Sequence, residues 1–255
     1  MDTKKRARQR LKVIEQSLAE VLIVHYSCES FADKPDGYSP RISSIAVKDF
    51  ESAQTQSFSI HNVAEIEGIL RSEIEQHYDR LERTMLDELS AFLAANKSCI
   101  YVHWNMRNAT YGFQAINHRH RTLGGTPFSI DDHRLIDLAR LLGDLHGPDY
   151  IDHPKMEKLI DLNNITKKHF LTGAEEAGAF EKKEYYRLHL STLRKVDAFS
   201  EILEKQLQGK LKTKIHPAIA RIQEMHEHWL FQAAELVLAL IGLGAAVYAF
   251  ASLFK

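Results

Sequence analysis

The sequence predicts an α/β domain with a mixed sheet flanked by helices, followed by one transmembrane helix at the C-terminus. Short apolar, β-branched runs alternate with longer amphipathic stretches, which is the pattern of strands joined by helical crossovers. The final stretch, 229–254, holds one charged residue, Glu235, and the 19 residues from Leu236 to Phe254 hold none. A helix of that length measures about 28 Å, close to the apolar thickness of a bilayer.

The chain is expected to have four parts. These are a basic N-terminal helix (1–19), the α/β domain (20–208), a juxtamembrane helix (209–228) and the transmembrane helix (229–254). Of the 255 residues, 44% are hydrophobic and 26% charged, as in a folded protein. The net charge of −1 gives no global argument for nucleic-acid binding. Two cysteines without a CxxC pair favour reduced thiols.

The elements of the domain follow in order. A buried strand is expected at 20–29, and the alternating segments 41–50 and 55–61 predict an antiparallel hairpin. The remaining expectations are a helix over 64–95 with a break near Gly68, a strand over 98–105, a helix over 111–123, a strand passing into a helix over 133–142, a helix over 153–165 and a long helix over 172–208. Thr172 and Glu175 have the spacing of a capping box at the start of that last helix.

The polar ends of two predicted parallel strands are the first place to expect a site. These ends are Glu29 and Asn105, and ligands in open α/β sheets bind beyond the carboxyl ends of parallel strands. Cys28, with His25 or His103 nearby, could act as a nucleophile, although a buried strand-end cysteine is the commoner situation. The chain has no GxxxxGK[ST], GxGxxG or GxSxG motif, so nucleotide hydrolysis and serine hydrolase chemistry lack support.

Three segments carry a resemblance to a known superfamily: Ser27-Cys28-Glu29, the stretch HWNMRNATYGFQAINHRHRTLG (103–124) and the stretch HLSTLRKVDAF (189–199). Over about residues 20–207 the chain resembles the DnaQ-type 3′–5′ exonucleases, which have a ribonuclease H-like fold. The resemblance implies a sheet of that type. It also implies a nuclease site with two Mg²⁺ or Mn²⁺ ions held by carboxylates, which position and activate the attacking water. The matching candidates for catalytic residues are Glu29, Asp197, His189, Asn105 and Asn108, with Glu29 and Asp197 as the metal ligands.

This chain departs from the family pattern at several of these positions. Ser27 and Asn108 stand where the family has aspartates. The residue five before Asp197 is Thr192, and His189 lies eight before it. Two remaining carboxylates leave a metal pair under-neutralised by about two charges, since Mg²⁺ and Mn²⁺ require hard oxygen ligands. We therefore expect weak or absent two-metal catalysis, and no cofactor unless the chain is a nuclease.

Positive charge gathers near both ends of the chain. The N-terminal group is Lys4, Lys5, Arg6, Arg8 and Arg10, which either forms a solvated helix face or contacts phosphates of nucleic acid or of lipid headgroups. A second group, Lys210, Lys212, Lys214 and Arg221, precedes the span. Because positive residues favour the cytoplasmic side, we expect a single-pass protein of the inner (plasma) membrane with a cytoplasmic domain.

Small residues line the predicted span. The candidates for contacts between membrane helices are Gly242, Gly244, Ala246 and Ala249, because small residues four apart let helices approach closely, together with the charged Glu235. The Glu235 side chain either extends to the cytoplasmic membrane–water interface or lines a contact between helices or a pore. A homo-oligomer is therefore expected.

The sequence leaves three functions open. The favoured one is a non-catalytic membrane-anchored effector or binding module, which senses a ligand, nucleic acid or partner and self-associates in the membrane, as in stress response or antiviral defence. The second is a membrane-tethered metal-dependent nuclease. The third is a scaffold that recruits a partner protein to the membrane.

Overall fold

The computed structural model describes residues 3–30, 38–107, 110–214 and, beyond these, Ala233, Leu236 and Leu238. The chain divides into two compact units, Met1–Lys212 and Thr213–Lys255. No helix within the described residues is long and apolar enough to cross a membrane. Apart from the three residues named above, the predicted span 229–254 lies outside the described part, as do its candidates Glu235, Gly242, Gly244, Ala246 and Ala249. Of the predicted juxtamembrane helix, residues 209–214 are described and are not helical.

The first unit contains a mixed five-stranded sheet with the order β3-β2-β1-β4-β5. The strands are β1 (Val21–Cys28), β2 (Ile42–Asp49), β3 (Thr55–Ser59), β4 (Ile100–His103) and β5 (Leu135–Asp137). β2 runs antiparallel to β1 and β3, whereas β1, β4 and β5 are parallel. The predicted α/β class, the hairpin and the mixed sheet are therefore confirmed.

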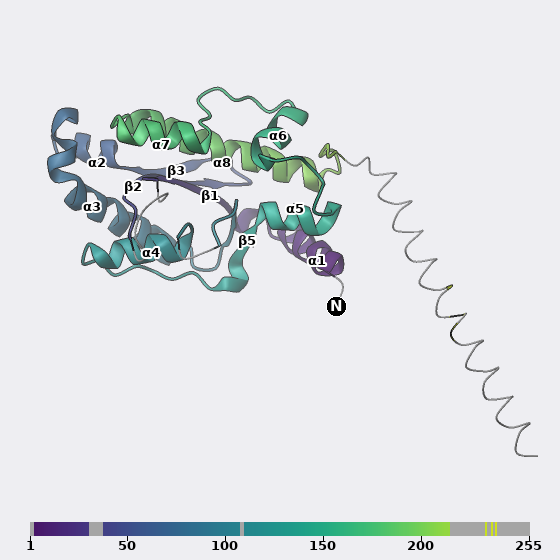
Figure 1. Ribbon diagram of the computed structural model, residues 1–255. Helices are drawn as coiled ribbons and strands as arrows, with labels where there is room; N and C mark the ends of the chain where they lie inside the picture. Colours follow the sequence, from purple (N-terminus) through teal and green to yellow (C-terminus); the bar gives the residue numbers. More distant parts are fainter. Residues whose placement is uncertain are drawn as a thin grey trace, which may run out of the picture. The chain divides into compact units, whose positions relative to one another are not determined.

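Helices cover both faces of the sheet (Figure 1). They are α1 (Thr3–Gln16), α2 (Ile60–Ile66), α3 (Ile74–Ala95), α4 (Phe113–Thr122), α5 (Leu138–His146), α6 (Lys155–Leu162), α7 (Gly173–Glu181) and α8 (Tyr185–Leu207). In Figure 1, α7 and α8 lie over one face and α3 and α4 over the other. α1 packs against α5, and its buried residues Ala7 and Ile14 join the core of the domain. The basic helix is thus part of the first unit.

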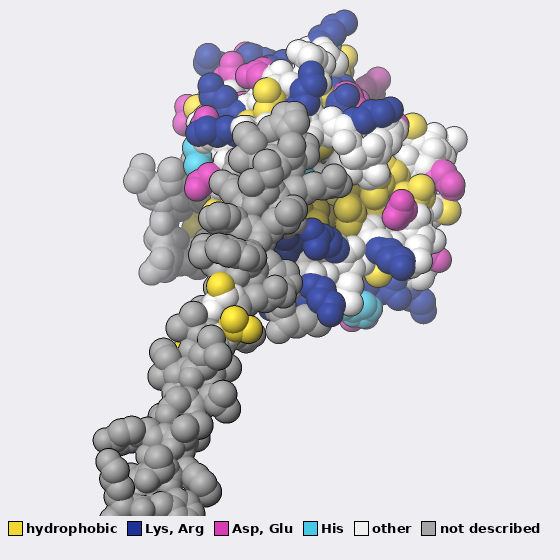
Figure 2. All heavy atoms as spheres, turned by 90° about the vertical axis from the view of Figure 1, so that its right-hand side faces the viewer, with side chains coloured by type: hydrophobic (Ala, Val, Ile, Leu, Met, Phe, Trp, Pro, Cys, Tyr) yellow, Lys and Arg dark blue, Asp and Glu magenta, His cyan; other side chains and the backbone are white. Residues whose placement is uncertain are grey.

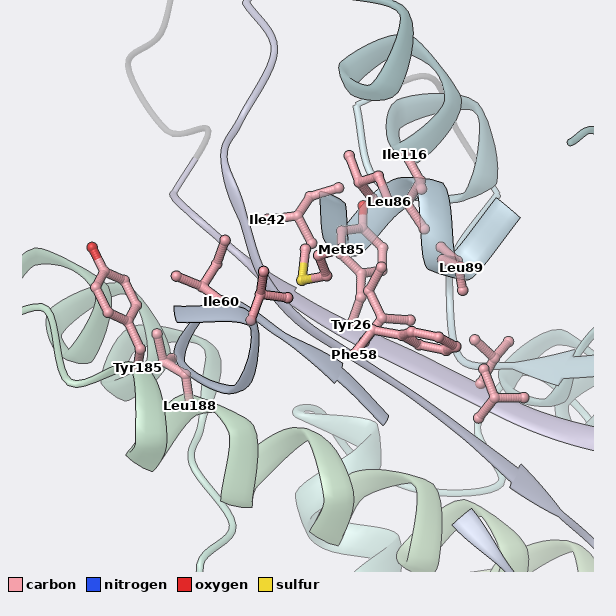
Figure 3. Close-up of a cluster of buried hydrophobic side chains, with 14 of the residues drawn as sticks. Tyr26, Ile42, Phe58, Ile60, Met85, Leu86, Leu89, Ile116, Tyr185 and Leu188 are labelled. Carbon is pink, nitrogen blue, oxygen red and sulfur yellow. The ribbon is translucent and has the colours of Figure 1, made fainter. Parts of the chain in front are cut away.

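The alternation of β1 supplies side chains to two hydrophobic cores. Leu22, Val24 and Tyr26 enter the first core, together with residues of α3. Figure 3 shows this core, with Tyr26 and Phe58 near Met85, Leu86 and Leu89. Val21 and Ile23 enter the second core with α1, α5 and α8. Residues 25 and 27 continue the second set along the strand, so they face α8.

Two predicted long helices are each interrupted. The helix expected over 64–95 is divided into α2 and α3, because Gly68 has a φ of 71° that a helix cannot continue. The helix expected over 172–208 was predicted wrongly as continuous. Lys183, with a φ of 59°, separates α7 from α8. The capping box of Thr172 and Glu175 is confirmed at the start of α7.

Candidate functional site

A cavity of about 590 Å³ lies beyond the carboxyl ends of β1 and β4, where a parallel sheet normally places its ligand. We call it the β1–β4 cavity. Its lining comes from β1 and the residues after it, the β4–α4 connection, the start of α6, α7 and α8. The lining includes His25, Cys28, Glu29, Trp104, Asn105, Tyr111, Phe170, Glu176 and Lys195.

An ion pair forms part of the cavity wall. Lys195 on α8 places its Nζ 2.7 Å from Glu176 Oε2 on α7. The side chains are 5% and 13% exposed, respectively, so water screens this pair little. Glu176 Oε1 also accepts hydrogen bonds from the hydroxyls of Ser27, at 3.0 Å, and Ser191, at 2.8 Å. The charged groups are therefore paired and further hydrogen-bonded, which is the condition under which a protein tolerates buried charge.

Hydroxyl groups surround the end of β1 beside this pair. Ser27 Oγ lies 2.8 Å from Thr192 Oγ1, and Ser44 Oγ lies 2.6 Å from the same atom. All three side chains are buried. The resembled family has metal-binding carboxylates at the end of its first strand, where this chain has Ser27 next to an α8 hydroxyl and a lysine ammonium. Mg²⁺ and Mn²⁺ prefer anionic oxygen ligands, and the Glu176 carboxylate beside Ser27 is paired with the Lys195 ammonium.

Two of the expected site residues meet at the β1–β4 cavity. Glu29 lines it, and its Oε2 accepts a hydrogen bond of 2.6 Å from the Tyr38 hydroxyl. Asn105 also lines it, in a left-handed backbone conformation with a φ of 56°. The Asn105 Oδ1 accepts a hydrogen bond of 3.2 Å from Arg107 Nη2. Both strand-end residues therefore line one cavity.

Asp197 and His189 lie elsewhere on α8. The Asp197 carboxylate is 2.6 Å from Lys48 Nζ and lines a different cavity. His189 Nδ1 lies 3.3 Å from His61 Nε2 of α2, and burial followed by the neighbouring His61 lowers the pKa of His189 to about 4. Thr192 and Asp197 are five residues apart on α8. Each helical residue rotates the side-chain direction by about 100°, so the two side chains point about 140° apart and Asp197 cannot face the end of β1 as Thr192 does. Asn108 lies outside the described residues.

Burial also controls the protonation of two groups of β1 that line the cavity. Burial, helped by the charge of Lys195, lowers the pKa of His25 well below its usual value, so the imidazole is neutral at pH 7. Burial, followed by the charges of Glu176 and Glu29, raises the pKa of the Cys28 thiol to about 12. Since the thiolate is the nucleophile, Cys28 is poorly suited to covalent catalysis.

The basic residues of α1 are mostly exposed. Lys5, Arg6, Arg8 and Arg10 are exposed and Lys4 is half-buried. Arg10 lines a second cavity. Within the described ranges, no group of three or more His, Cys, Asp or Glu side chains is arranged to hold a metal ion.

In comparisons with known proteins, no family model matches the chain, and no curated protein or solved structure is recognisably similar to it. The functional argument therefore rests on the residues of this chain.

Glu176 and Lys195 are the two functional candidates that the sequence patterns did not reveal. Lys195 had a detectable signal, because Leu188, Thr192, Lys195, Phe199 and Ile202 recur at helical spacing and form the inward stripe of α8. A lysine in such a stripe requires a buried anionic partner. Glu176 directly follows the capping glutamate and had no comparable signal.

Proposed function

We propose that the chain is a membrane-anchored binding module or effector, whose degenerate ribonuclease H-like domain holds a ligand in the β1–β4 cavity instead of two metal ions. The strand order β3-β2-β1-β4-β5, with β2 antiparallel to its neighbours, supports a fold of this type. The position of the cavity, beyond the parallel strands β1 and β4, supports the same proposal.

One observation carries the proposal: the ion pair between Lys195 and Glu176 at the polar end of β1. A two-metal nuclease concentrates negative charge at this position, so that the cations bind and polarise water and phosphate. Here the Lys195 ammonium already neutralises the Glu176 carboxylate. The arrangement favours the binding of an organic ligand over metal-dependent hydrolysis.

The walls of the cavity suggest what such a ligand is like. Trp104, Tyr111 and Phe170 supply aromatic surface, and Glu29 supplies a carboxylate. Small-molecule sites typically combine apolar walls with a few polar groups that fix orientation. A flat, apolar group that carries hydrogen-bond donors, such as a nucleobase, matches this lining better than an anion, which would meet Glu29 and Glu176.

The catalytic alternative is tested by incubating the purified full-length protein in detergent with single-stranded and double-stranded DNA and RNA, in Mg²⁺ or Mn²⁺. We expect no cleavage above that of the doubly substituted variant Glu29→Ala/Glu176→Gln. Asp197→Ala serves as the control at a site remote from the cavity. Metal-dependent cleavage that is lost in the double variant and kept in the control would show that the nuclease alternative is correct.

The anchored effector is tested with the full chain and a version that ends at His228. We expect the full chain to sediment with membranes and to form cross-linked oligomers, and the shortened chain to do neither. Equal membrane association and equal oligomer formation by the two versions would refute the anchoring part of the proposal. Oligomers that form without any change in membrane permeability, together with a copurifying protein, would indicate a scaffold.

A further inference from the structure

A second cavity, of about 670 Å³, is separate from the ligand site proposed above and is lined by four arginines. We call it the arginine cavity. Arg10 comes from α1, Arg107 from the β4–α4 connection, Arg121 from α4 and Arg140 from α5. Elements far apart in the sequence thus bring four arginine residues to the lining of one cavity. Figure 2, which views the side of the molecule where α1 and α5 lie in Figure 1, shows Lys and Arg side chains on both the upper and the lower part of this face.

The charge of this lining is positive. Four arginines face two aspartates, Asp132 and Asp137, which leaves an excess of two positive charges. The Asp137 carboxylate is already engaged, because its Oδ2 lies 2.6 Å from Arg107 Nε and its Oδ1 caps the first turn of α5. Among the described residues, neither Arg10 nor Arg121 forms an ion pair with a carboxylate. Both are exposed, so their guanidinium groups are available to a ligand.

A buried hydrogen-bond donor also lines the cavity. His103 is 2% exposed, and its Nδ1 accepts a hydrogen bond of 3.2 Å from the backbone N–H of Met106. Burial lowers the pKa of His103 to about 4, so at pH 7 the neutral ring carries its proton on Nε2. Within the described part of the chain, no group accepts a hydrogen bond from that Nε2.

The start of α4 adds a favourable dipole. Phe113 and Gln114 in its first turn line the cavity, and its N-cap, Gly112, contributes no side-chain cap. Uncapped N–H groups at a helix N-terminus favour an anion.

We propose that the arginine cavity binds the phosphate groups of a small organic phosphate of nucleotide size. One guanidinium group can donate two parallel hydrogen bonds to the oxygens of a phosphate. Several arginines around one cavity therefore favour a ligand with more than one negative charge. The volume lies in the range of ordinary small-molecule sites, about 300–1,000 Å³. A concave site built from four elements suits a compact ligand better than a nucleic-acid backbone, which contacts a row of positive groups along an extended surface.

The test is isothermal titration calorimetry of the full-length protein in detergent and phosphate-free buffer. The probes are ADP, pyrophosphate, a single-stranded oligonucleotide and glycerol 3-phosphate, which carries the phosphate and the glycerol backbone of phosphatidic acid. The informative variant is Arg10→Ala/Arg121→Ala. The matched control is Arg8→Ala/Lys12→Ala, which removes the same charge from exposed positions of α1 that do not line the cavity.

We expect ADP and pyrophosphate to bind at the arginine cavity, with affinity weakened about tenfold or more in the Arg10/Arg121 variant and unchanged in the control. Circular dichroism should show that both variants are folded. Preferential binding of glycerol 3-phosphate with the same loss would support the phosphate site and assign it to a lipid headgroup. Three outcomes overturn the proposal: no binding of any probe, equal weakening in the control, or binding of a single-stranded oligonucleotide without binding of ADP.

Discussion

Replacing Lys195 with methionine should destabilise the protein by about 3 kcal/mol. Removing one partner of a buried ion pair costs about 3–5 kcal/mol, because the other charge stays buried without compensation. Lys195 and Glu176 are 5% and 13% exposed, respectively, so the pair belongs to that class. Glu176 keeps its hydrogen bonds from Ser27 and Ser191, which places the loss at the lower end of the range. Methionine preserves the length of the apolar stem, so little of the effect comes from a new cavity.

The assay is urea unfolding of the full-length protein, followed by far-ultraviolet circular dichroism. The double variant Glu176→Gln/Lys195→Met should recover most of the lost stability, because it removes both charges while the amide oxygen still accepts bonds from the serine hydroxyls. Lys48→Met is the matched control. It removes the partner of the more exposed Asp197 and should cost about 1 kcal/mol or less.

Two results would refute this reasoning. The first is a loss of less than about 1 kcal/mol in Lys195→Met, which is the size typical of exposed pairs. The second is a double variant that is no more stable than the single one, since a real ion pair must show coupling between its two members.

Three further predictions concern groups at or near the sites. His189 has a folded-state pKa of about 4, below its usual 6.5, so the unfolded chain binds protons first and the stability falls as pH drops through this window. In urea titrations at pH 7 and pH 4, His189→Leu should reduce this fall by about 3 kcal/mol. The Cys28 thiol has a pKa of about 12 instead of 9, so little of it is thiolate at pH 8. Iodoacetamide should therefore alkylate it about a thousandfold more slowly in the folded than in the unfolded protein. Equal alkylation rates would contradict the burial of Cys28. Gly112→Ala should destabilise the domain by about 2 kcal/mol or more, because a Cβ there would lie 2.6 Å from Met106 O at a φ of 152°, and an unchanged melting temperature would contradict this.

The sheet and part of the β1–β4 cavity follow from local sequence patterns. Alternating apolar residues identify the β2–β3 hairpin, and the polar ends of two parallel strands bring Glu29 and Asn105 to one cavity. The break at Gly68 was also readable, since glycine permits the positive φ found there.

The rest of the site depends on contacts between distant parts of the chain. Ser27 and Glu176 are 149 residues apart, and no periodicity encodes that contact. The assignment of Asp197 relied on spacing within a sequence motif, whereas the rotation of α8 directs Thr192 toward the end of β1 and Asp197 toward Lys48. The arginine cavity likewise combines residues from four elements, of which the sequence singled out only Arg10 as a phosphate contact.

Manganese binding tests the central claim most directly, namely that Lys195 and Glu176 occupy the position where a nuclease holds metal ions. The measurement is Mn²⁺ titration of the full-length protein, followed by electron paramagnetic resonance, in the wild type and in Glu29→Ala/Glu176→Gln. The account predicts that the wild type and the double variant bind the same amount of Mn²⁺. One or two Mn²⁺ ions per chain that bind to the wild type and not to the double variant would contradict it.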